Sequence, residues 1–218
     1  MYLSRLILNP RSRRVQKEIA NPYEMHRSIM HAFPDDLKSD RERVLFRLES
    51  QRRTGNLTLL VQSWMLPDWS WLAEPGARGY LLPVGEPNPA IKSFELALAP
   101  SQTLAFRLRA NPTVKRDGKR HGLFRVEEQR EWLTRKAERG GFRVLSAQIA
   151  NTSDAEGWIR HSEQRHKLKL FAVRFDGFLR VNEPEQLRET VRHGIGPGKG
   201  LGFGLLSLAR PRQPAGQP

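Results

Sequence analysis

Three side chains that can move protons or hold a phosphate occur close together near the start of the chain. Tyr23, His26 and Arg27 follow Asn21-Pro22, a pair that favours the start of a helix. On a helix these positions share a face, because residues three and four apart are neighbours. Histidine can serve as acid or base near neutral pH, tyrosine can donate or position a proton, and arginine can stabilise a phosphate. Such a set suits RNA cleavage by the RNA's own 2′-hydroxyl, which needs neither a protein nucleophile nor a metal. At this spacing alone a packed histidine is the commoner outcome, so the triplet needs support from elsewhere.

A second candidate is the glycine-rich run 194–204, in which six glycines occur in eleven residues. Glycine lets backbone N–H groups approach a phosphate closely, and Lys199 adds positive charge. We therefore predict phosphate contact at Gly198, Lys199 and Gly200. The run is not a P-loop, because Gly200 stands where a serine or threonine should hold magnesium. A flexible turn is the simpler alternative.

The charge of the chain favours a polyanionic partner. Its 37 lysines and arginines exceed its 23 acidic residues by 14, and residues 103–143 carry half of that excess. A charge kept only for solubility would be spread evenly along the chain. The clustering of positive charge therefore favours a nucleic-acid partner, bound mostly through its phosphates. Besides the candidates above, the predicted RNA-binding residues are Lys115, Arg116, Lys119, Arg120, Arg125, Arg130, Arg135, Arg160, Arg165 and Lys167.

Several classes of function are excluded or disfavoured. The chain has no cysteine, so disulfides, zinc knuckles and cysteine nucleophiles are excluded, which is compatible with a reducing cytoplasm. His26 and His31 do not share a helix face well, and Asp35-Asp36 has no partners at ligand spacing. We therefore predict no metal site and no cofactor. No stretch resembles a secretion signal or a membrane span, so we expect a soluble cytoplasmic protein without membrane contact.

The elements that must position these residues follow an order that repeats. We predict an α+β fold of two tandem ferredoxin-like (RRM-like) βαββαβ domains, residues 1–100 and 101–209, followed by a disordered tail, 210–218. The first half reads as strand 2–8, a helical stretch 11–33 broken at Asn21-Pro22, strands 44–49 and 57–64, a short helix near 69–72 and a strand near 94–98. The second half reads as strand 103–110, a turn at Asp117-Gly118, helix 126–139, strands 142–149, 169–175 and 178–181, helix 183–193 and strand 204–208. The polar stretch within residues 160–169 could form a hairpin.

Three segments in this order resemble the CasE family, the CRISPR repeat-processing endoribonucleases of type I-E systems. They are residues 21–27, just after a first strand ending Leu-Asn-Pro, then Phe106–Lys115, and then Gly194–Ser207. The resemblance covers nearly the whole chain and is weakest at about 66–100 and 150–167. It implies two ferredoxin-like domains, the first carrying the catalytic helix and the second binding RNA with the glycine-rich loop.

The resemblance also implies an activity and partners. The family cleaves precursor CRISPR RNA at the 3′ base of the repeat hairpin without metal, leaving a 5′-hydroxyl and a cyclic or 3′-phosphate. It then keeps the mature crRNA as a subunit of Cascade, so the partners would be the repeat RNA hairpin and other Cascade subunits. Its catalytic tyrosine and histidine correspond to Tyr23 and His26, with Arg27 and Lys199 binding phosphate. We assign His26 as acid and Tyr23 as base or orienting group, and leave the reverse open.

Two alternatives remain at this point. One is a non-catalytic RNA-binding module of the same fold, in which His26 is structural. The other is a DNA-binding protein, which is disfavoured because nothing resembles a recognition helix or a dimer seam.

Overall fold

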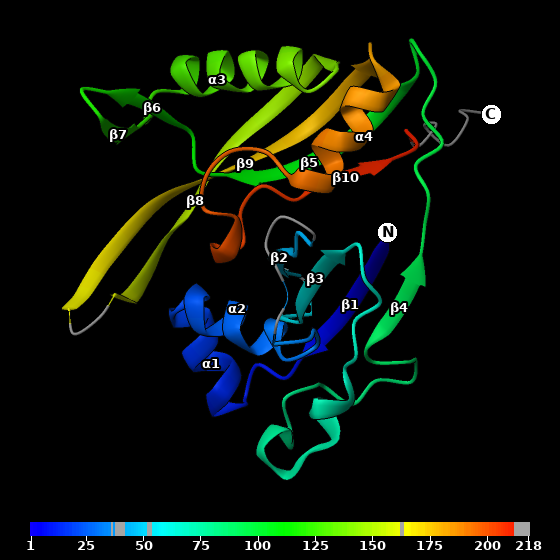
Figure 1. Cartoon of the computed structure of the whole chain (residues 1–218), viewed down its shortest axis with the longest axis vertical. Coiled ribbons are helices and arrows are strands. Elements are labelled where there is room, and N and C mark those ends of the chain that lie inside the picture. The colour runs from blue at the N-terminus through cyan, green and yellow to red at the C-terminus, as the bar shows by residue number, and fades with distance from the viewer. Residues whose placement is uncertain (36, 38–41, 52–53, 162–163, 212–218) are drawn as a thin grey trace.

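The computed structural model describes residues 1–35, 37, 42–51, 54–161 and 164–211, without the side chains of residues 151–170. Most of the predicted tail 210–218 therefore lies outside the described residues. Figure 1 shows two units, each built on a sheet, with the chain crossing from one to the other after β4.

The N-terminal unit is a four-stranded antiparallel sheet with strand order β2-β3-β1-β4. Apolar residues of the first two helices, Val15, Met25 and Ile29, pack on Leu6 and Leu59 of the sheet to form its core. The elements of this unit are β1 (Tyr2–Leu8), α1 (Arg13–Ala20), α2 (Pro22–Met30), β2 (Leu45–Ser50), β3 (Leu57–Ser63), the short 3-10 helices η1 (Ser70–Ala73) and η2 (Pro75–Ala77), and β4 (Ala90–Ser93).

The C-terminal unit repeats this plan with strand order β10-β5-β9-β8. Trp132, Leu133 and Leu187 pack on one face of the sheet, against Leu108 and Phe175. The elements are β5 (Thr103–Ala110), the β-hairpin β6 (Thr113–Arg116) and β7 (Lys119–Gly122), α3 (Val126–Arg139), β8 (Phe142–His161), β9 (Gln164–Val181), α4 (Pro184–His193), the 3-10 helix η3 (Lys199–Leu201) and β10 (Leu206–Ala209).

Both sheets place their strands in the same spatial order, which confirms the prediction of two ferredoxin-like units. Within each unit the first and third strands lie at the centre, and the second and fourth lie at the edges. The expected break between the two helical pieces at Pro22 is present, as is the turn at Asp117-Gly118, where both residues have positive φ. The expected hairpin within residues 160–169 is confirmed, because β8 and β9 pair antiparallel as far as His161 opposite Gln164.

One predicted strand was placed wrongly, two others are parts of a single strand, and the last strand differs at its start. The fourth strand is Ala90–Ser93 rather than 94–98, because Leu96 and Leu98 pack against the second core instead. The strands 169–175 and 178–181 are one continuous strand, β9. Gly177 permits this continuity, because a Cβ there would overlap the carbonyl of Ser146 on β8. The last strand begins at Leu206, after the glycines have ended.

The outward face of the second sheet is turned toward the first unit. Side chains of β5 alternate, so that Leu104, Phe106 and Leu108 enter the core while Arg107 and Arg109 lie on the opposite face. Arg47 on β2 joins the units there, donating from Nη1 to the carbonyl oxygen of Leu205 at 3.0 Å and from Nη2 to Ser207 Oγ at 2.9 Å. The predicted boundary near residue 100 remains a proposal, which the two separate cores support.

Candidate functional site

Helix α2 carries Tyr23 from the first unit into contact with the second. Pro22 occupies the first turn of the helix, where its missing N–H costs nothing, so α2 can begin immediately after α1 ends. The ring of Tyr23 packs against a small cluster of Ala172 on β9 with Leu201 and Phe203 of the glycine-rich loop. Tyr23 therefore lies at the junction of the two units and the loop.

His26 lies one turn further along the same helix, between Phe46 of β2 and the glycine-rich loop. Its ring stacks on Phe46 with centroids 6.1 Å apart, and a Cβ added at Gly200 would lie 3.6 Å from its Nε2. The Nδ1 atom is buried and has no hydrogen-bond partner among the described residues. Burial lowers the pKa of His26 below 6.5, so the free protein holds a neutral imidazole at neutral pH.

The glycine-rich loop closes over this helix as η3, flanked by two left-handed glycines. Gly198 has φ +83° and Gly202 has φ +80°, values that a residue with a Cβ adopts only at a cost. A Cβ at Gly202 would also lie 3.1 Å from the ring of Phe46. Glycine at 202 is thus needed for both the turn and the close approach of η3 to the ring on which His26 stacks.

Beyond Lys199 lies a hollow of about 560 Å³ lined by cations, which we call the basic hollow. It is formed by the β6–β7 hairpin, helix α3 and the glycine-rich loop. Burial lowers the pKa of Lys199, with a further contribution from the nearby charges of Arg43, Lys136 and Arg120. The crowding of like charges favours an anion in this hollow. Its basic side chains are Lys115, Arg120, Lys136, Arg139 and Lys199.

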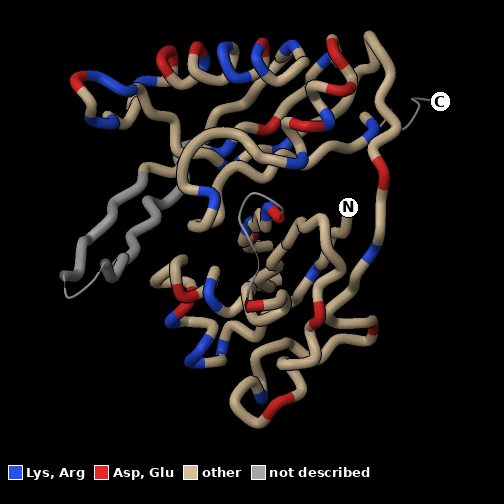
Figure 2. The backbone as a smooth tube through the Cα atoms, in the orientation of Figure 1, with Lys and Arg blue, Asp and Glu red and all other residues tan. Residues whose placement is uncertain are grey.

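Three of the predicted RNA-binding residues, Lys115, Arg120 and Lys199, therefore meet in the basic hollow. Two others, Arg116 and Lys119, flank the turn of the β6–β7 hairpin and are exposed. Figure 2 shows lysines and arginines gathered on this hairpin, and alternating with acidic residues along α3.

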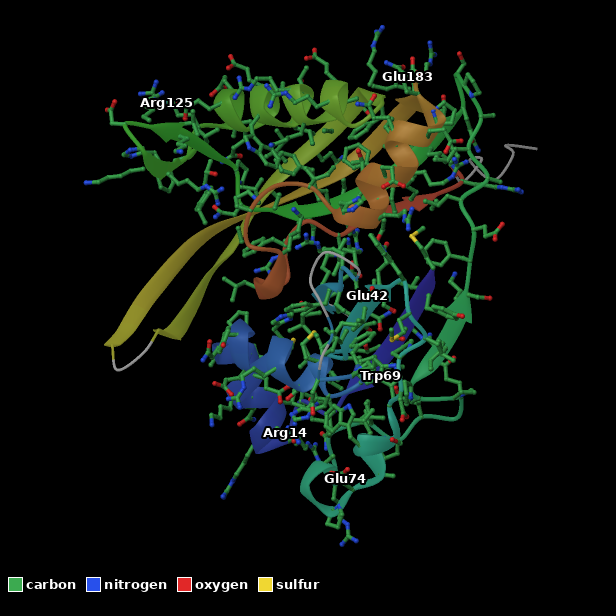
Figure 3. The ribbon with its side chains drawn as sticks, viewed as in Figure 1. Arg14, Glu42, Trp69, Glu74, Arg125 and Glu183 are labelled. Atoms are coloured by element: carbon green, nitrogen blue, oxygen red, sulfur yellow. The ribbon has the colours of Figure 1, made fainter. Side chains whose placement is uncertain are left out.

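The remaining predicted residues of α3 lie on its surface. Arg125 is the N-cap residue of the helix, at its outer end in Figure 3. Arg130 is exposed, and Arg135 forms an exposed ion pair with Glu131 at 3.6 Å. None of these three lines the basic hollow, and their role in RNA binding stays a prediction.

Arg27 lies apart from the partners of Tyr23 and His26. Its side chain is 63% exposed and pairs with Glu24 at 3.3 Å, over a hollow formed with α1 that includes neither Tyr23 nor His26. Its predicted phosphate contact therefore stays a prediction. The side chains of Arg160, Arg165 and Lys167 lie outside the described residues, so their predicted RNA contacts stay predictions as well.

The predicted set omitted several basic residues that the fold brings to these surfaces. Lys136 and Arg139 line the basic hollow from the same helix face as Trp132, and spacing along α3 was the signal for them. Arg107 and Arg109 lie on the face of β5 turned toward the first unit, which the alternation of Thr103–Ala110 could have indicated.

The described part of the chain contains no cluster of three or more histidine, aspartate or glutamate side chains placed to hold a metal ion. None of its described helices is long and apolar enough to span a membrane.

Comparison with known proteins places the chain in a family. Residues 1–210 match the family model described as CRISPR associated protein. The chain is 42% identical to the CRISPR-associated endoribonuclease Cse3 of Thermus thermophilus, covering 96% of this chain and 100% of that protein. It is 28% identical to the CRISPR system Cascade subunit CasE of Escherichia coli, covering 96% of this chain and 99% of that protein.

The chain belongs to the CRISPR-associated Cse3/CasE family. Its fold superposes with a TM-score of 0.79 on Thermus thermophilus Cse3 bound to an RNA representing a pre-cleavage complex, at 42% identity, covering 95% of this chain and 98% of that one. The tandem ferredoxin-like architecture predicted from the sequence is thus that of a Cse3/CasE protein.

Proposed function

We propose that this protein is an endoribonuclease that cuts precursor CRISPR RNA at the 3′ base of the repeat hairpin and then retains the mature crRNA as a Cascade subunit. Its relative in Thermus thermophilus is named an endoribonuclease, and its relative in Escherichia coli is named a Cascade subunit. Cleavage proceeds by attack of the 2′-hydroxyl without a metal ion. We infer that it works in the cytoplasm, as expected from the sequence.

One arrangement supports this proposal above all. Tyr23 and His26 pack against the glycine-rich loop, and Lys199 of the same loop lines the basic hollow. An RNA stem held by its phosphates in the basic hollow would therefore end beside two groups able to move protons. That juxtaposition favours an enzyme over a binding module of the same fold.

The state of His26 suggests how the two groups divide the work. A neutral imidazole can take the proton of the 2′-hydroxyl, whereas a general acid must be protonated beforehand. Because burial lowers the pKa of His26, we assign it as base and Tyr23 as donor to the departing 5′-oxygen, the reverse of the assignment from the sequence. Lys199 stabilises the charge that builds on the phosphorane oxygens.

The decisive experiment is cleavage of a radiolabelled repeat hairpin RNA in EDTA, followed by analysis of the product ends. We expect a single cut at the 3′ base of the hairpin, a 5′-hydroxyl on one product and a cyclic or 3′-phosphate on the other. A 2′-deoxy substitution before the cut removes the nucleophile and should abolish the reaction.

Two results would contradict the proposal in different ways. Tight binding without any product would make the protein an RNA-binding module. Product from the 2′-deoxy RNA, or cleavage only when a divalent ion is restored, would mean that water rather than the ribose attacks the phosphorus.

A further inference from the structure

A groove on the far side of η3 from the basic hollow runs between the two units. It consists of a cavity of about 490 Å³ and a neighbouring one of about 1150 Å³, which share Glu49, Ser50, Arg107 and Arg174. We call the two together the interdomain groove. The first cavity begins beside the catalytic helix, where Pro22 and Met25 form part of its wall.

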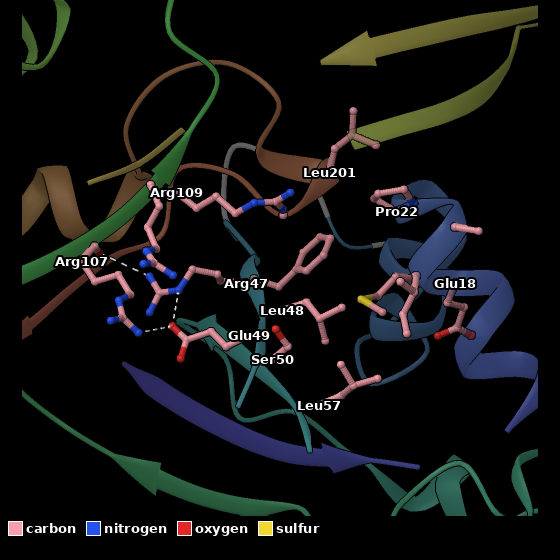
Figure 4. Close-up of a pocket in the computed structure, with 16 residues that line it drawn as sticks. Glu18, Pro22, Arg47, Leu48, Glu49, Ser50, Leu57, Arg107, Arg109 and Leu201 are labelled. Carbon is pink, nitrogen blue, oxygen red and sulfur yellow. Dashed lines mark hydrogen bonds and ion pairs between the residues drawn. The ribbon is translucent and has the colours of Figure 1, made fainter. Parts of the chain in front are cut away.

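Arginine dominates one side of the interdomain groove. Figure 4 shows Arg47, Arg107 and Arg109 gathered on one side of the first cavity, with Glu18 and Pro22 of the first two helices on the other. Strand register explains part of this, since Arg109 on β5 stands directly opposite Arg174 on β9. Like charges placed opposite each other across a sheet are destabilising unless an anion compensates them.

Carboxylates compensate most of these arginines but not Arg109. Glu49 accepts from Arg47 at 2.8 Å, and Asp176 pairs with both Arg107 and Arg174. Three guanidinium groups thus share two carboxylates, and Arg109 pairs with neither of them.

Arg109 is the uncompensated member of this group. Its guanidinium lies 4.7 Å above the ring of Phe203 and has no carboxylate or hydrogen-bond partner within the part of the chain that the structure describes. Burial and the charge of Arg47 both lower its pKa, so the site disfavours the bare cation. An anion in the groove would remove that penalty.

The position of η3 connects this groove to the reaction. Lys199 at the start of η3 lines the basic hollow, Gly200 faces His26, and Leu201 with Gly202 lines the interdomain groove. Three successive parts of one turn therefore face the stem site, the catalytic histidine and the groove. A strand that passes from the stem over His26 enters the groove next.

We propose that the interdomain groove binds the single-stranded RNA that continues on the 3′ side of the cut, with Arg109 holding its first phosphate. This rests on the proposed function, which places the cut at the 3′ base of the stem. The opposite wall, where Leu48 and Leu57 are half-buried, offers apolar surface to the bases without reading their sequence. By holding the 3′ strand, the groove would fix the position of the departing 5′-oxygen, which belongs to the first nucleotide of that strand.

The test compares RNAs that share one hairpin but differ in their flanks. Binding is measured in a His26→Ala background, so that no RNA is cut, with a hairpin ending at the cut, a hairpin with a single-stranded 3′ extension, and one with a 5′ extension. We expect the 3′ extension to strengthen binding. Arg109→Gln should weaken the affinity for the 3′-extended RNA by about tenfold and leave the affinity for the bare hairpin unchanged.

Arg78→Gln is the matched control. It removes the same charge from an exposed position between η2 and β4 and should leave all three affinities unchanged. Thermal unfolding adds a second readout. Because Arg109 is uncompensated, Arg109→Gln should not lower the melting temperature, whereas a residue that merely holds the fold together would.

The outcomes separate this inference from the proposed function. If the wild-type protein cuts the hairpin but the 3′ extension adds no affinity, the interdomain groove does not bind the 3′ strand and the inference is wrong. Equal weakening of all three RNAs by Arg109→Gln, or an effect confined to the 5′ extension, would overturn the inference as well. If the wild-type protein neither binds nor cuts any hairpin, the proposed function itself fails.

Discussion

His26 shows how surroundings set the chemistry of one residue. Its ring is enclosed between Phe46 and the turn at Gly200, and desolvation lowers the pKa of the imidazole. The glycine-rich loop that contacts His26 through Gly200 carries Lys199 on its opposite side, where Lys199 lines the basic hollow. The same residue on an open helix face would titrate near 6.5 and be partly protonated at neutral pH.

The pH dependence of cutting distinguishes a base from an acid. If His26 is the base, kcat/KM for cleavage should rise with pH through a pKa below 6.5 and level off by about pH 7, because only the neutral imidazole accepts a proton. Single-turnover cleavage, with the enzyme in excess of the RNA but below saturation, measures this across a pH series at constant ionic strength. A rate that falls over the same range would return His26 to the role of acid.

His26→Ala should lower the cleavage rate about 10²- to 10⁴-fold and remove this pH dependence, with RNA affinity nearly unchanged. Tyr23→Phe is the companion variant, since it loses only the hydroxyl while its ring still packs on Leu201 and Phe203. It should slow cleavage but keep the rise with pH. Normal cleavage by His26→Ala would exclude His26 from the mechanism.

At the scale of elements, the site depends on how closely η3 approaches α2 and β2. Gly202 allows that approach, because it takes a left-handed conformation within contact distance of Phe46. Strands and helices carry the rest of the site, but this turn places Gly200 beside His26 and Lys199 in the basic hollow. A small backbone change there should affect chemistry more than folding.

Gly202→Ala should therefore reduce cleavage at least tenfold while destabilising the fold by only about 1–2 kcal/mol. Gly55→Ala is the matched control, because Gly55 also has positive φ, +70°, but none of the described residues lies within 4 Å of an added Cβ. Both variants should lose similar stability in urea unfolding, and only Gly202→Ala should lose activity. Equal cleavage activity in the two variants would show that cleavage does not depend on the close approach of η3 to Phe46.

At the scale of the whole molecule, Arg47 joins the two units. Its side chain is almost fully buried, and its donors reach Glu49 on its own strand and Leu205 and Ser207 of the second unit. The groove, the catalytic helix and the loop all meet at this junction. The relative position of the two units therefore decides whether the site exists.

Arg47→Leu should destabilise the protein by about 3 kcal/mol, because it leaves buried acceptors without their charged donor. We also expect urea unfolding to separate into two steps as the units lose their connection. Arg5→Gln is the control, since the exposed pair between Arg5 and Glu86 should contribute less than about 1 kcal/mol. One unchanged transition in Arg47→Leu would show that other contacts hold the units together.

The sequence by itself determined the elements and most of their order. Periodicity predicted β1, β5 and α3 with the observed bounds, because each has a regular pattern of apolar residues that its own core requires. The local spacing of Tyr23 and His26 also predicted a shared helix. The prediction was wrong at 94–98, where the apolar pattern suggested a strand of the first unit but Leu96 and Leu98 pack against the core of the second.

Only the tertiary structure decided what these elements bring together. Residues 26 and 200 are far apart in the chain, and their contact depends on how two separately patterned units dock. The same docking leaves Arg109 in the interdomain groove without a carboxylate partner among the described residues. Packing within the second unit, between α3 and the glycine-rich loop, gathers Lys136 with Lys199 in the basic hollow. Local patterns do not encode such contacts, because side-chain periodicity records burial against a core and not the partner that faces it across an interface.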